Sequence, residues 1–327
     1  MKVLVTGGAG YIGSHACKAL ARAGHAPVAF DDLSTGWRDA VRFGPLVEGS
    51  LSDREALARA FAEHAPDAVM HFAARSLVGE AMADPGKYWR ENVGGAANLL
   101  DAMAGAGCRS IVFSSTCATY GEHDGVELDE DCAQEPLNAY GASKLAVEAM
   151  LRDFEAAHGI SHVIFRYFNV AGADAEAEIG ERHEPETHLI PVMLQAVAGT
   201  RDGLTLHGTD YATRDGTCVR DYVHVEDLVD AHLKGLDWLE GGRPSRAFNL
   251  GTGTGFTVRE VIDASRAVTN REVPVTEGPR RAGDATSLVS GSRRAAEELG
   301  WEPERSTMDR MIADAWRWHR SGGFGAG

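Results

Sequence analysis

The chain has 327 residues, of which 44% are apolar and 24% charged, values that are typical of a folded globular protein and exclude a disordered or fibrous one. Its net charge of −16 opposes binding to a phosphate backbone, so we expect no nucleic-acid partner. The sequence contains no run of about 18 uncharged apolar residues, so we expect no membrane span.

The N-terminus and the cysteines indicate a cellular compartment. The first residues lead directly into glycines, without the apolar stretch of a secretory signal. The five cysteines are odd in number and form no C-x-x-C pair, which argues against a disulfide framework or a zinc site. We therefore expect a cytoplasmic protein with free thiols and no metal.

Short apolar runs alternate with longer helical stretches in the first half of the chain. The runs cover residues 2–6, 28–30, 46–48, 68–72, 110–113 and 162–166, and a helix is expected from about Ile12. Parallel strands need connections of about a dozen residues or more, as found here. The alternation predicts an α/β fold with a Rossmann-type, doubly wound parallel sheet covered on both faces.

This rhythm ends after about Asn169, where loop-rich sequence indicates a smaller C-terminal α/β domain. Helices are expected over 225–239, 258–269 and 306–320, and a strand over 246–250 that returns to the first sheet. The glycine-rich end, 322–327, is expected to fray. The first domain is thus predicted to comprise 1–169 with a return segment at 224–250, and the second 170–223 and 251–327.

A glycine-rich loop lies between the first strand and the first helix. Residues 6–13 read Thr-Gly-Gly-Ala-Gly-Tyr-Ile-Gly, which places Gly7, Gly10 and Gly13 where a backbone must approach a pyrophosphate, with Tyr11 and Ile12 opening the helix. Glycine spacing alone is weak support, but a strand precedes this loop and a helix follows it. The pattern predicts a dinucleotide site.

An acidic residue follows the second strand at the distance typical of such sites. Asp31 comes 18 residues after Gly13, where its carboxylate would accept the adenosine ribose hydroxyls and repel a 2′-phosphate. This favours NAD over NADP. The neighbouring Asp32 is an alternative ribose ligand or a solvated loop charge.

Tyr140 and Lys144 lie four residues apart on one face of an expected helix. A phenol with a pKa near 10 is a poor base at neutral pH, and lowering that pKa by ~3 units requires about 4 kcal/mol of stabilisation of the phenolate. The ammonium of Lys144 and a cationic nicotinamide are able to supply it. The pair is predicted to act as a general acid and base.

Ser114 and Thr116 follow the fifth apolar run, at the carboxyl end of a parallel strand, where ligands of such sheets bind. One of these hydroxyls is expected to contact the reacting alcohol. The alternative is a turn or capping hydroxyl.

These segments together resemble the extended short-chain dehydrogenase/reductase family. The motifs are 6–14, 114–121, 140–144 and 166–169. Further motifs at 71–74, 78–80, 215–225 and 280–284 resemble the UDP-glucose 4-epimerase family within it, and the resemblance covers nearly the whole chain. It implies that the first domain binds NAD and the second a UDP-sugar.

The resemblance implies a reversible C4 epimerisation of UDP-glucose and UDP-galactose. Tyr140 would take the proton of the sugar 4-hydroxyl while hydride passes to tightly bound NAD+, giving a 4-keto sugar. Lys144 would lower the pKa of Tyr140 and hold the nicotinamide ribose, and Thr116 would bond the 4-oxygen. Return of the hydride to the other face of the ketone would invert C4.

The resemblance also implies binding residues. Further NAD contacts would come from Ser50, Leu51, Phe72, Ala73, Ala74, Asn92, Ser114 and Phe168. Arg220 and Arg281 would bind the substrate diphosphate as charged donors. Other substrate contacts would come from Asn169, His188, Leu189, Thr205, His207, Asp284 and Leu288.

The sequence departs from relatives at four of these positions. Ser50 replaces an adenine-binding Asp, His188 an Asn, and His207 a Phe beside the uracil. Leu288 stands where some members place a bulky Tyr, which suggests that N-acetylated substrates, UDP-GlcNAc and UDP-GalNAc, are also accepted.

Alternative functions remain open on the sequence. A sugar-nucleotide dehydratase of the same family would need an Asp-Glu pair at 117 and 118, where this chain has Cys117 and Ala118. A UDP-pentose 4-epimerase, a simple reductase and a non-enzymatic dinucleotide sensor are further candidates. The family implies a homodimer, but the apolar positions of 92–103 and 146–154 suit packing within one chain equally well.

Overall fold

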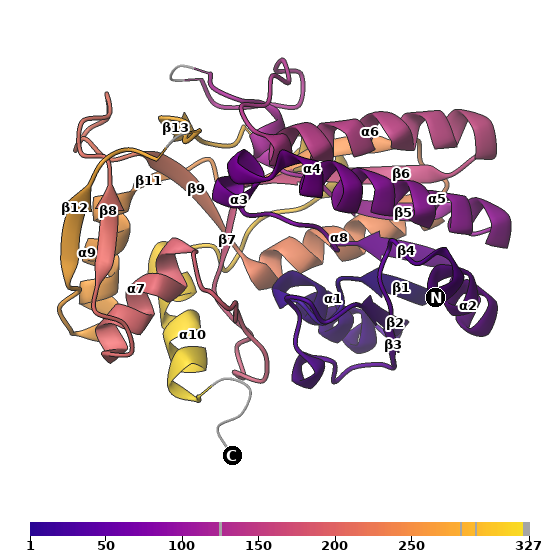
Figure 1. Cartoon of the computed structure of the whole chain (residues 1–327), viewed down its shortest axis with the longest axis horizontal. Helices are drawn as coiled ribbons and strands as arrows, with labels where there is room; N and C mark the ends of the chain where they lie inside the picture. Colours follow the sequence, from indigo (N-terminus) through magenta and orange to yellow (C-terminus); the bar gives the residue numbers. More distant parts are fainter. Residues whose placement is uncertain (124–125, 282, 292, 323–327) are drawn as a thin grey trace.

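The computed structural model describes residues 1–123, 126–281, 283–291 and 293–322. Its centre is a seven-stranded parallel sheet with the strand order β10-β6-β5-β4-β1-β2-β3 (Figure 1). The strands are β1 (Lys2–Thr6), β2 (Ala26–Asp31), β3 (Leu46–Glu48), β4 (Ala68–His71), β5 (Ser110–Ser114), β6 (Ser161–Tyr167) and β10 (Arg246–Leu250). The expected Rossmann-type α/β fold is confirmed.

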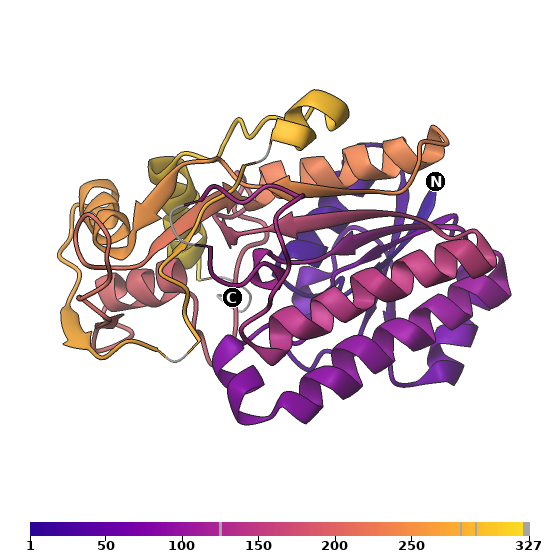
Figure 2. The same ribbon diagram turned by 90° about the horizontal axis from the view of Figure 1, so that it is seen from above.

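Helices cover both faces of this sheet, as Figure 2 shows with α8 on one side and α5 and α6 on the other. Helices α1 (Tyr11–Arg22) and α8 (Val225–Glu240) pack on the first face, and α2 (Arg54–His64), α5 (Gly95–Ala106) and α6 (Ala139–His158) on the second. Within β1, Val3 and Val5 belong to the core of the first face and Leu4 to that of the second. Side chains alternate along a strand, so an unbroken apolar run fills both cores.

The chain leaves this sheet after β6 and comes back at β10. Arg246 pairs with Val163 and Leu250 with Tyr167, so β10 lies parallel to β6 at the sheet edge. Helix α8 leads into β10 and packs beside α1. Between β6 and α8 the chain builds much of a smaller unit.

That smaller unit lies at the carboxyl ends of the central strands (Figure 1). It contains a four-stranded sheet of β7 (Asn169–Ala171), β9 (Val219–His224), β11 (Gly255–Thr257) and β13 (Ser287–Leu288), and a pair, β8 (Leu204–His207) with β12 (Val275–Gly278). Its core is packed by α7 (Leu189–Ala198), α9 (Val258–Thr269) and α10 (Met308–Arg320).

Short helical segments complete the architecture. They are η1 (Arg38–Ala40), α3 (Val78–Ala83), α4 (Pro85–Tyr88), the π-helix η2 (Trp89–Gly94), η3 (Cys117–Thr119) and the π-helix η4 (Ala295–Leu299). Within the described residues, no helix combines the length and the apolar character needed to cross a bilayer. All five cysteines lie in this described part and are free. The end expected to fray lies, from residue 323 onward, outside the described residues.

Candidate active site

The glycine loop joins β1 to α1 and lies beside the carboxyl ends of β2 and β4. A Cβ on Gly7, whose φ is +73°, would lie 2.7 Å from the Ala73 nitrogen, and a Cβ on Gly13 would lie 2.0 Å from the Gly7 carbonyl oxygen. Gly10 caps α1 with its backbone alone, and the first turn, which is fully described, carries no acidic side chain. The loop therefore needs these glycines, and it leaves the positive end of α1 suited to a pyrophosphate.

Asp31, the last residue of β2, is held against this loop. Its buried carboxylate accepts hydrogen bonds from the backbone N–H groups of Ala9 at 3.0 Å and Leu33 at 2.8 Å. Burial raises its pKa, and these two bonds oppose the rise. A carboxylate offers about four acceptor positions, so capacity remains for ribose hydroxyls. Asp32 instead bonds the backbone and hydroxyl of Ser34 on the exposed side.

The ends of the neighbouring strands complete the predicted NAD-binding edge. The N–H groups of Phe72 and Ala73, just after β4, both donate to the carbonyl oxygen of Thr6. Tyr11 donates from its hydroxyl to the Gly172 carbonyl oxygen at 2.7 Å, which ties α1 to the loop after β7. The other predicted cofactor residues near these strand ends are Ile12, Ser50, Leu51, Ala74 and Ser114.

Asn92 lies buried in the π-helix η2, and its amide group is occupied within the protein. Its Oδ1 accepts from the Arg75 N–H at 2.8 Å, and its Nδ2 donates to the Arg75 carbonyl and to Ser143 Oγ, both at 3.0 Å. The side chain therefore fixes the segment after β4 against α6. This role was not visible in the sequence.

The predicted acid–base residues meet at the carboxyl end of β5. Asn138 caps α6 by accepting from the Gly141 N–H, and this sets Tyr140 in the first turn of the helix. The Thr116 hydroxyl, which accepts from the Ala118 N–H at 3.1 Å, lies near enough to the phenol to act on its pKa. Burial raises the pKa of Tyr140 well above its usual value, and the Thr116 hydroxyl opposes the rise. A phenolate here thus needs stabilisation from a positive charge.

Lys144 lies one turn further along α6 and is 3% exposed. Its Nζ donates to the Ser114 carbonyl oxygen at 2.7 Å and lies 4.8 Å from the centre of the Phe113 ring. Burial lowers the pKa of Lys144 to about 7, although the charge of Glu148 acts to raise it. The ammonium is thus placed beside the strand that carries Thr116.

A buried polar network that was not predicted from the sequence lies behind these residues. Glu148, which is fully buried, pairs with Arg166 at 2.7 Å and accepts from Ser115 Oγ at 2.5 Å. Arg166 also donates to the Tyr120 hydroxyl at 3.0 Å. Glu148 follows Lys144 by four residues on α6, a spacing that marks a shared helix face and was the available signal.

The predicted substrate residues of the smaller unit gather around β9. Arg220 is paired in register with Leu288 of β13, and its Nη2 lies 3.9 Å from Asp284 Oδ1. Leu288 packs in a cluster with Phe168 and Cys117, the residue after Thr116. This cluster therefore joins β13 to the cofactor side of the site.

Other predicted residues lie on separate elements. Asn169 pairs with Tyr222 across β7 and β9. Thr205 and His207 lie on β8, in the two-stranded sheet, and His207 Nδ1 is 3.2 Å from the Pro279 carbonyl oxygen. Arg281 is exposed on the connection between β12 and β13. Of these positions, Asn169 lies on the strand next to β9, whereas Thr205 and His207 lie in the separate β8–β12 pair.

His188 precedes α7, which begins at the predicted Leu189. Its Nδ1 lies 2.7 Å from Glu181 Oε1 and 3.5 Å from Glu186 Oε1. Burial acts to lower its pKa, but the two carboxylates outweigh this effect and raise the pKa to about 10. The pairing was not expected from the sequence.

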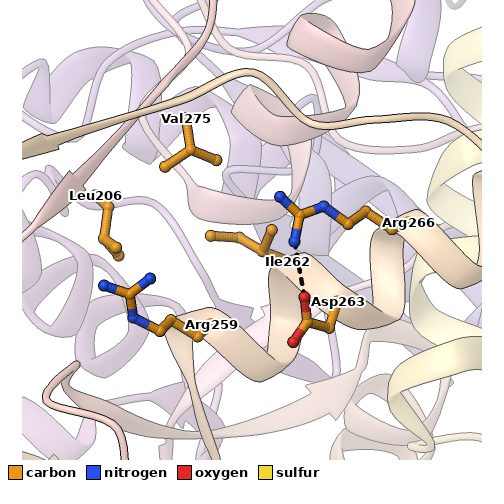
Figure 3. A pocket seen from close by; sticks show the side chains of 6 residues that line it. All are labelled: Leu206, Arg259, Ile262, Asp263, Arg266 and Val275. Carbon is orange, nitrogen blue, oxygen red and sulfur yellow. Dashed lines mark hydrogen bonds and ion pairs between the residues drawn. The ribbon is translucent and has the colours of Figure 1, made fainter.

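A pocket in the smaller unit lies elsewhere. Figure 3 shows it between β8, β12 and α9, with Arg266 donating to Asp263 at 2.9 Å. None of its lining residues is a predicted site residue; they are Leu206, Arg259, Ile262, Asp263, Arg266 and Val275. The predicted chemistry therefore does not belong to this pocket.

Comparisons with known proteins place this geometry in a family. Residues 3–251 match the NAD dependent epimerase/dehydratase family. The UDP-glucose 4-epimerase of Rhizobium meliloti is 49% identical, over 97% of this chain and 96% of that protein. The crystal structure of UDP-glucose 4-epimerase from Brucella ovis in complex with NAD has a TM-score of 0.94 and 47% identity, covering 97% of this chain and 98% of that one.

A third relative was solved with a different sugar nucleotide. The UDP-glucose-4-epimerase of Stenotrophomonas maltophila, with bound NAD and formylated UDP-arabinopyranose, has a TM-score of 0.94 and 40% identity, covering 98% of each chain. The strand–loop–helix geometry and these full-length matches agree. The chain belongs to the NAD dependent epimerase/dehydratase family and, within it, to the UDP-glucose 4-epimerase family.

Proposed function

We propose that this chain catalyses the reversible C4 epimerisation of UDP-glucose and UDP-galactose through a 4-keto sugar. The observation that carries the proposal is the meeting of Thr116, Tyr140 and Lys144 at the carboxyl end of β5, beside the glycine loop. A phenol with a hydroxyl and an ammonium beside it suits proton transfer to and from a secondary alcohol.

Tyr140 is the proton carrier. Its Oη accepts the proton of the sugar 4-hydroxyl and later returns it to the 4-oxygen. Burial alone disfavours the phenolate, so the ammonium of Lys144 has to remain charged during this exchange. The Thr116 hydroxyl, beside Tyr140, orients the alcohol.

The residues around the first strand ends fit NAD. Gly7, Gly10 and Gly13 keep the backbone open at the start of α1, and Asp31 presents a buried carboxylate at the end of β2. NAD+ bound there would supply reversible hydride acceptance at the sugar carbon. The Asp31 charge opposes a 2′-phosphate and so favours NAD over NADP.

Arg220, supported by Asp284, anchors the substrate diphosphate, and Arg281 contributes from the exposed connection. Inversion at C4 requires the ketone to present both faces in turn. We propose that the nucleotide is held firmly by these charges while the hexose contacts few fixed groups.

Two substrate variations follow from particular observations. Leu288 leaves more room beside the hexose than a Tyr would, which supports turnover of UDP-GlcNAc and UDP-GalNAc. The relative solved with formylated UDP-arabinopyranose supports a UDP-pentose 4-epimerase as the second candidate. A dehydratase is disfavoured because Cys117 and Ala118 carry no carboxylate.

We further propose that 1–169 with 224–250 forms the NAD domain, and that 170–223 with 251–327 forms the UDP-sugar domain. A homodimer would pair the outer faces of α5 and α6, which lie side by side in both views (Figures 1 and 2). The five free thiols suit the reducing cytoplasm.

The proposal is tested by incubating the pure protein with UDP-galactose, without added reductant, and measuring UDP-glucose. Tyr140→Phe should reduce the rate by about 10²–10⁴ because the general acid–base group is lost, while bound NAD is retained. Tyr88→Phe is the matched control, since the Tyr88 ring lies 6.4 Å from the Tyr140 ring while its hydroxyl donates to the Leu77 carbonyl oxygen. Parent-like turnover by Tyr140→Phe would refute the assignment.

A further inference from the structure

Four side chains converge in the loop between β7 and α7. Glu181, His183, Glu186 and His188 each offer one ligand atom, and these atoms all lie within 4.8 Å of one another. Two are imidazole nitrogens and two are carboxylate oxygens. This donor set is one that zinc uses in proteins.

The distances between these atoms suit a single small cation. His183 Nδ1 lies 3.4 Å from Glu181 Oε1 and 3.5 Å from Glu186 Oε2. His188 Nδ1 lies 3.5 Å from Glu186 Oε1 and 2.7 Å from Glu181 Oε1. Bonds of about 2.0–2.2 Å to a tetrahedral ion place neighbouring donors about 3.3–3.6 Å apart. Three of these separations have this length, although the two to Glu186 end on different oxygens, and the 2.7 Å contact of His188 with Glu181 would lengthen when an ion replaces it.

The burial of the group also calls for a cation. The side chains of Glu181 and Glu186 are 7% and 3% exposed, and their charge is balanced by the two imidazoles beside them; a divalent ion would supply the same charge in place of the two ring protons. The buried Nδ1 of His183 has no hydrogen-bond partner among the described residues, although it lies close to both carboxylates. The His188 side chain is 45% exposed and provides access from solvent.

A second acidic group shows how the protein neutralises such a cluster when no ion is needed. Asp174, Glu176 and Glu178 surround the ammonium of Lys18 at 2.6, 2.8 and 2.6 Å. In that group the Lys18 ammonium supplies the compensating positive charge. Around Glu181 and Glu186 the ion pairs are formed by His183 and His188, and an imidazole, unlike an ammonium, is able to ligate a metal ion.

We propose that Glu181, His183, Glu186 and His188 form a binding site for Zn²⁺. Imidazole donors favour Zn²⁺ over Mg²⁺, which prefers six oxygen ligands. The ion would fasten the loop after β7 to the start of α7. The Nε2 atom and the backbone of His188 stay available to the sugar nucleotide.

This site was not expected from the sequence, because the chain has no cysteine pair of the kind that binds zinc. The motif His183-x-x-Glu186-x-His188 contains neither cysteine nor the spacing of a helical zinc motif. Its donors converge in the segment that precedes α7.

The test measures metal binding and does not depend on epimerase activity. The NAD-loaded protein is stripped with a chelator, dialysed against Zn²⁺ or Mg²⁺, and its metal content is determined by elemental analysis. We expect one Zn²⁺ per chain and no retained Mg²⁺. His183→Asn and Glu186→Gln should each weaken Zn²⁺ binding on the order of 100-fold.

Glu176→Gln is the matched control, since it removes an acid from the Lys18 cluster and should leave Zn²⁺ binding unchanged. The parent protein also provides a test that needs no variant: Co²⁺ should give the strong visible absorption of a tetrahedral site. Absence of Zn²⁺ uptake by the parent, an octahedral Co²⁺ spectrum, or equal Zn²⁺ binding in the parent and in both ligand variants would overturn the proposal.

Discussion

The ammonium of Lys144 donates a 2.7 Å hydrogen bond to the carbonyl oxygen of Ser114. This bond joins α6, which carries Tyr140, to the end of β5, which leads into Thr116. One side chain thereby fixes the distance between the two elements and places a positive charge in a buried site. The electrostatic and the structural roles of Lys144 are therefore coupled.

Replacing Lys144 by Met removes both roles of the ammonium and leaves the Tyr140 phenol in place. Burial raises the pKa of Tyr140, and the variant lacks the positive charge that the proposed mechanism uses to stabilise the phenolate. We expect epimerisation to fall by about 10²–10⁴, with the acidic limb of the kcat–pH profile moved to higher pH.

A pH series of initial rates measures this shift. Lys87→Met is the control, because Lys87 pairs with Glu80 outside the site and its loss should change the rate less than about twofold. An unshifted acidic limb in Lys144→Met would show that Lys144 does not support the phenolate.

Asp31 and Asp32 are distinguished by their partners. Asp31 is buried against Ala9 of the glycine loop, whereas Asp32 bonds Ser34 on the exposed side. Asp31→Asn should weaken NAD binding by about 10- to 100-fold, because a charged acceptor for ribose hydroxyls is lost at roughly 1.5–3 kcal/mol. It should also narrow the preference for NAD over NADP.

Titration of the NAD-free protein with each dinucleotide measures both effects. Asp32→Asn is the matched control and should change NAD affinity less than about threefold. A larger effect from Asp32→Asn than from Asp31→Asn would reverse the assignment.

His232 provides a prediction about stability and pH. It is fully buried on α8, between the Leu228 carbonyl oxygen at 2.8 Å and Ser114 Oγ at 3.0 Å, and burial lowers its pKa to about 4. Between pH 6.5 and 4 the unfolded chain binds a proton at this position that the folded chain does not. The contribution of His232 to the free energy of unfolding should therefore fall as pH drops, by about 2 kcal/mol from pH 7 to pH 4.5.

Urea unfolding of the parent and of His232→Gln, at fixed saturating NAD, measures this term. The variant is expected to be less stable at pH 7, and the difference should shrink towards pH 4.5. Parallel stability curves over this range would contradict a neutral buried His232.

The sequence predicted the bounds of an element best where the residues that favour the element locally also determine how it packs. The runs at 2–6 and 246–250 became strands with those bounds, because central parallel strands are apolar on both faces. The helix α9 likewise spans the predicted 258–269, where Thr257 and Glu260 form a capping box.

The rest depended on contacts between distant segments. The helix α7 and the pairing of β8 with β12 lie in sequence that looked loop-rich, because their apolar faces are recognisable only against α9 and α10. The hydrogen bonds of Asn92 to Arg75 and the ion pairs of His188 join residues through loops without regular periodicity. Sequence spacing carries no signal for such contacts.

Leu288 tests how the site selects its sugar. It is paired in register with Arg220 and packs with Phe168 and Cys117, so it lies between the diphosphate anchor and the acid–base residues.

Leu288→Tyr adds a ring to this partly buried position and should exclude an N-acetyl group more strongly than a hydroxyl. We expect kcat/KM for UDP-GlcNAc to fall by about 10- to 200-fold, as steric discrimination of small groups usually gives, with UDP-galactose changed only a few-fold. Leu288→Met, which conserves volume, is the matched control. Parallel assays with the two substrates measure this effect. Background turnover of UDP-GlcNAc by the parent chain would reject the wider substrate range. Equal losses for both substrates in Leu288→Tyr would show that residue 288 supports packing of the site without selecting the sugar.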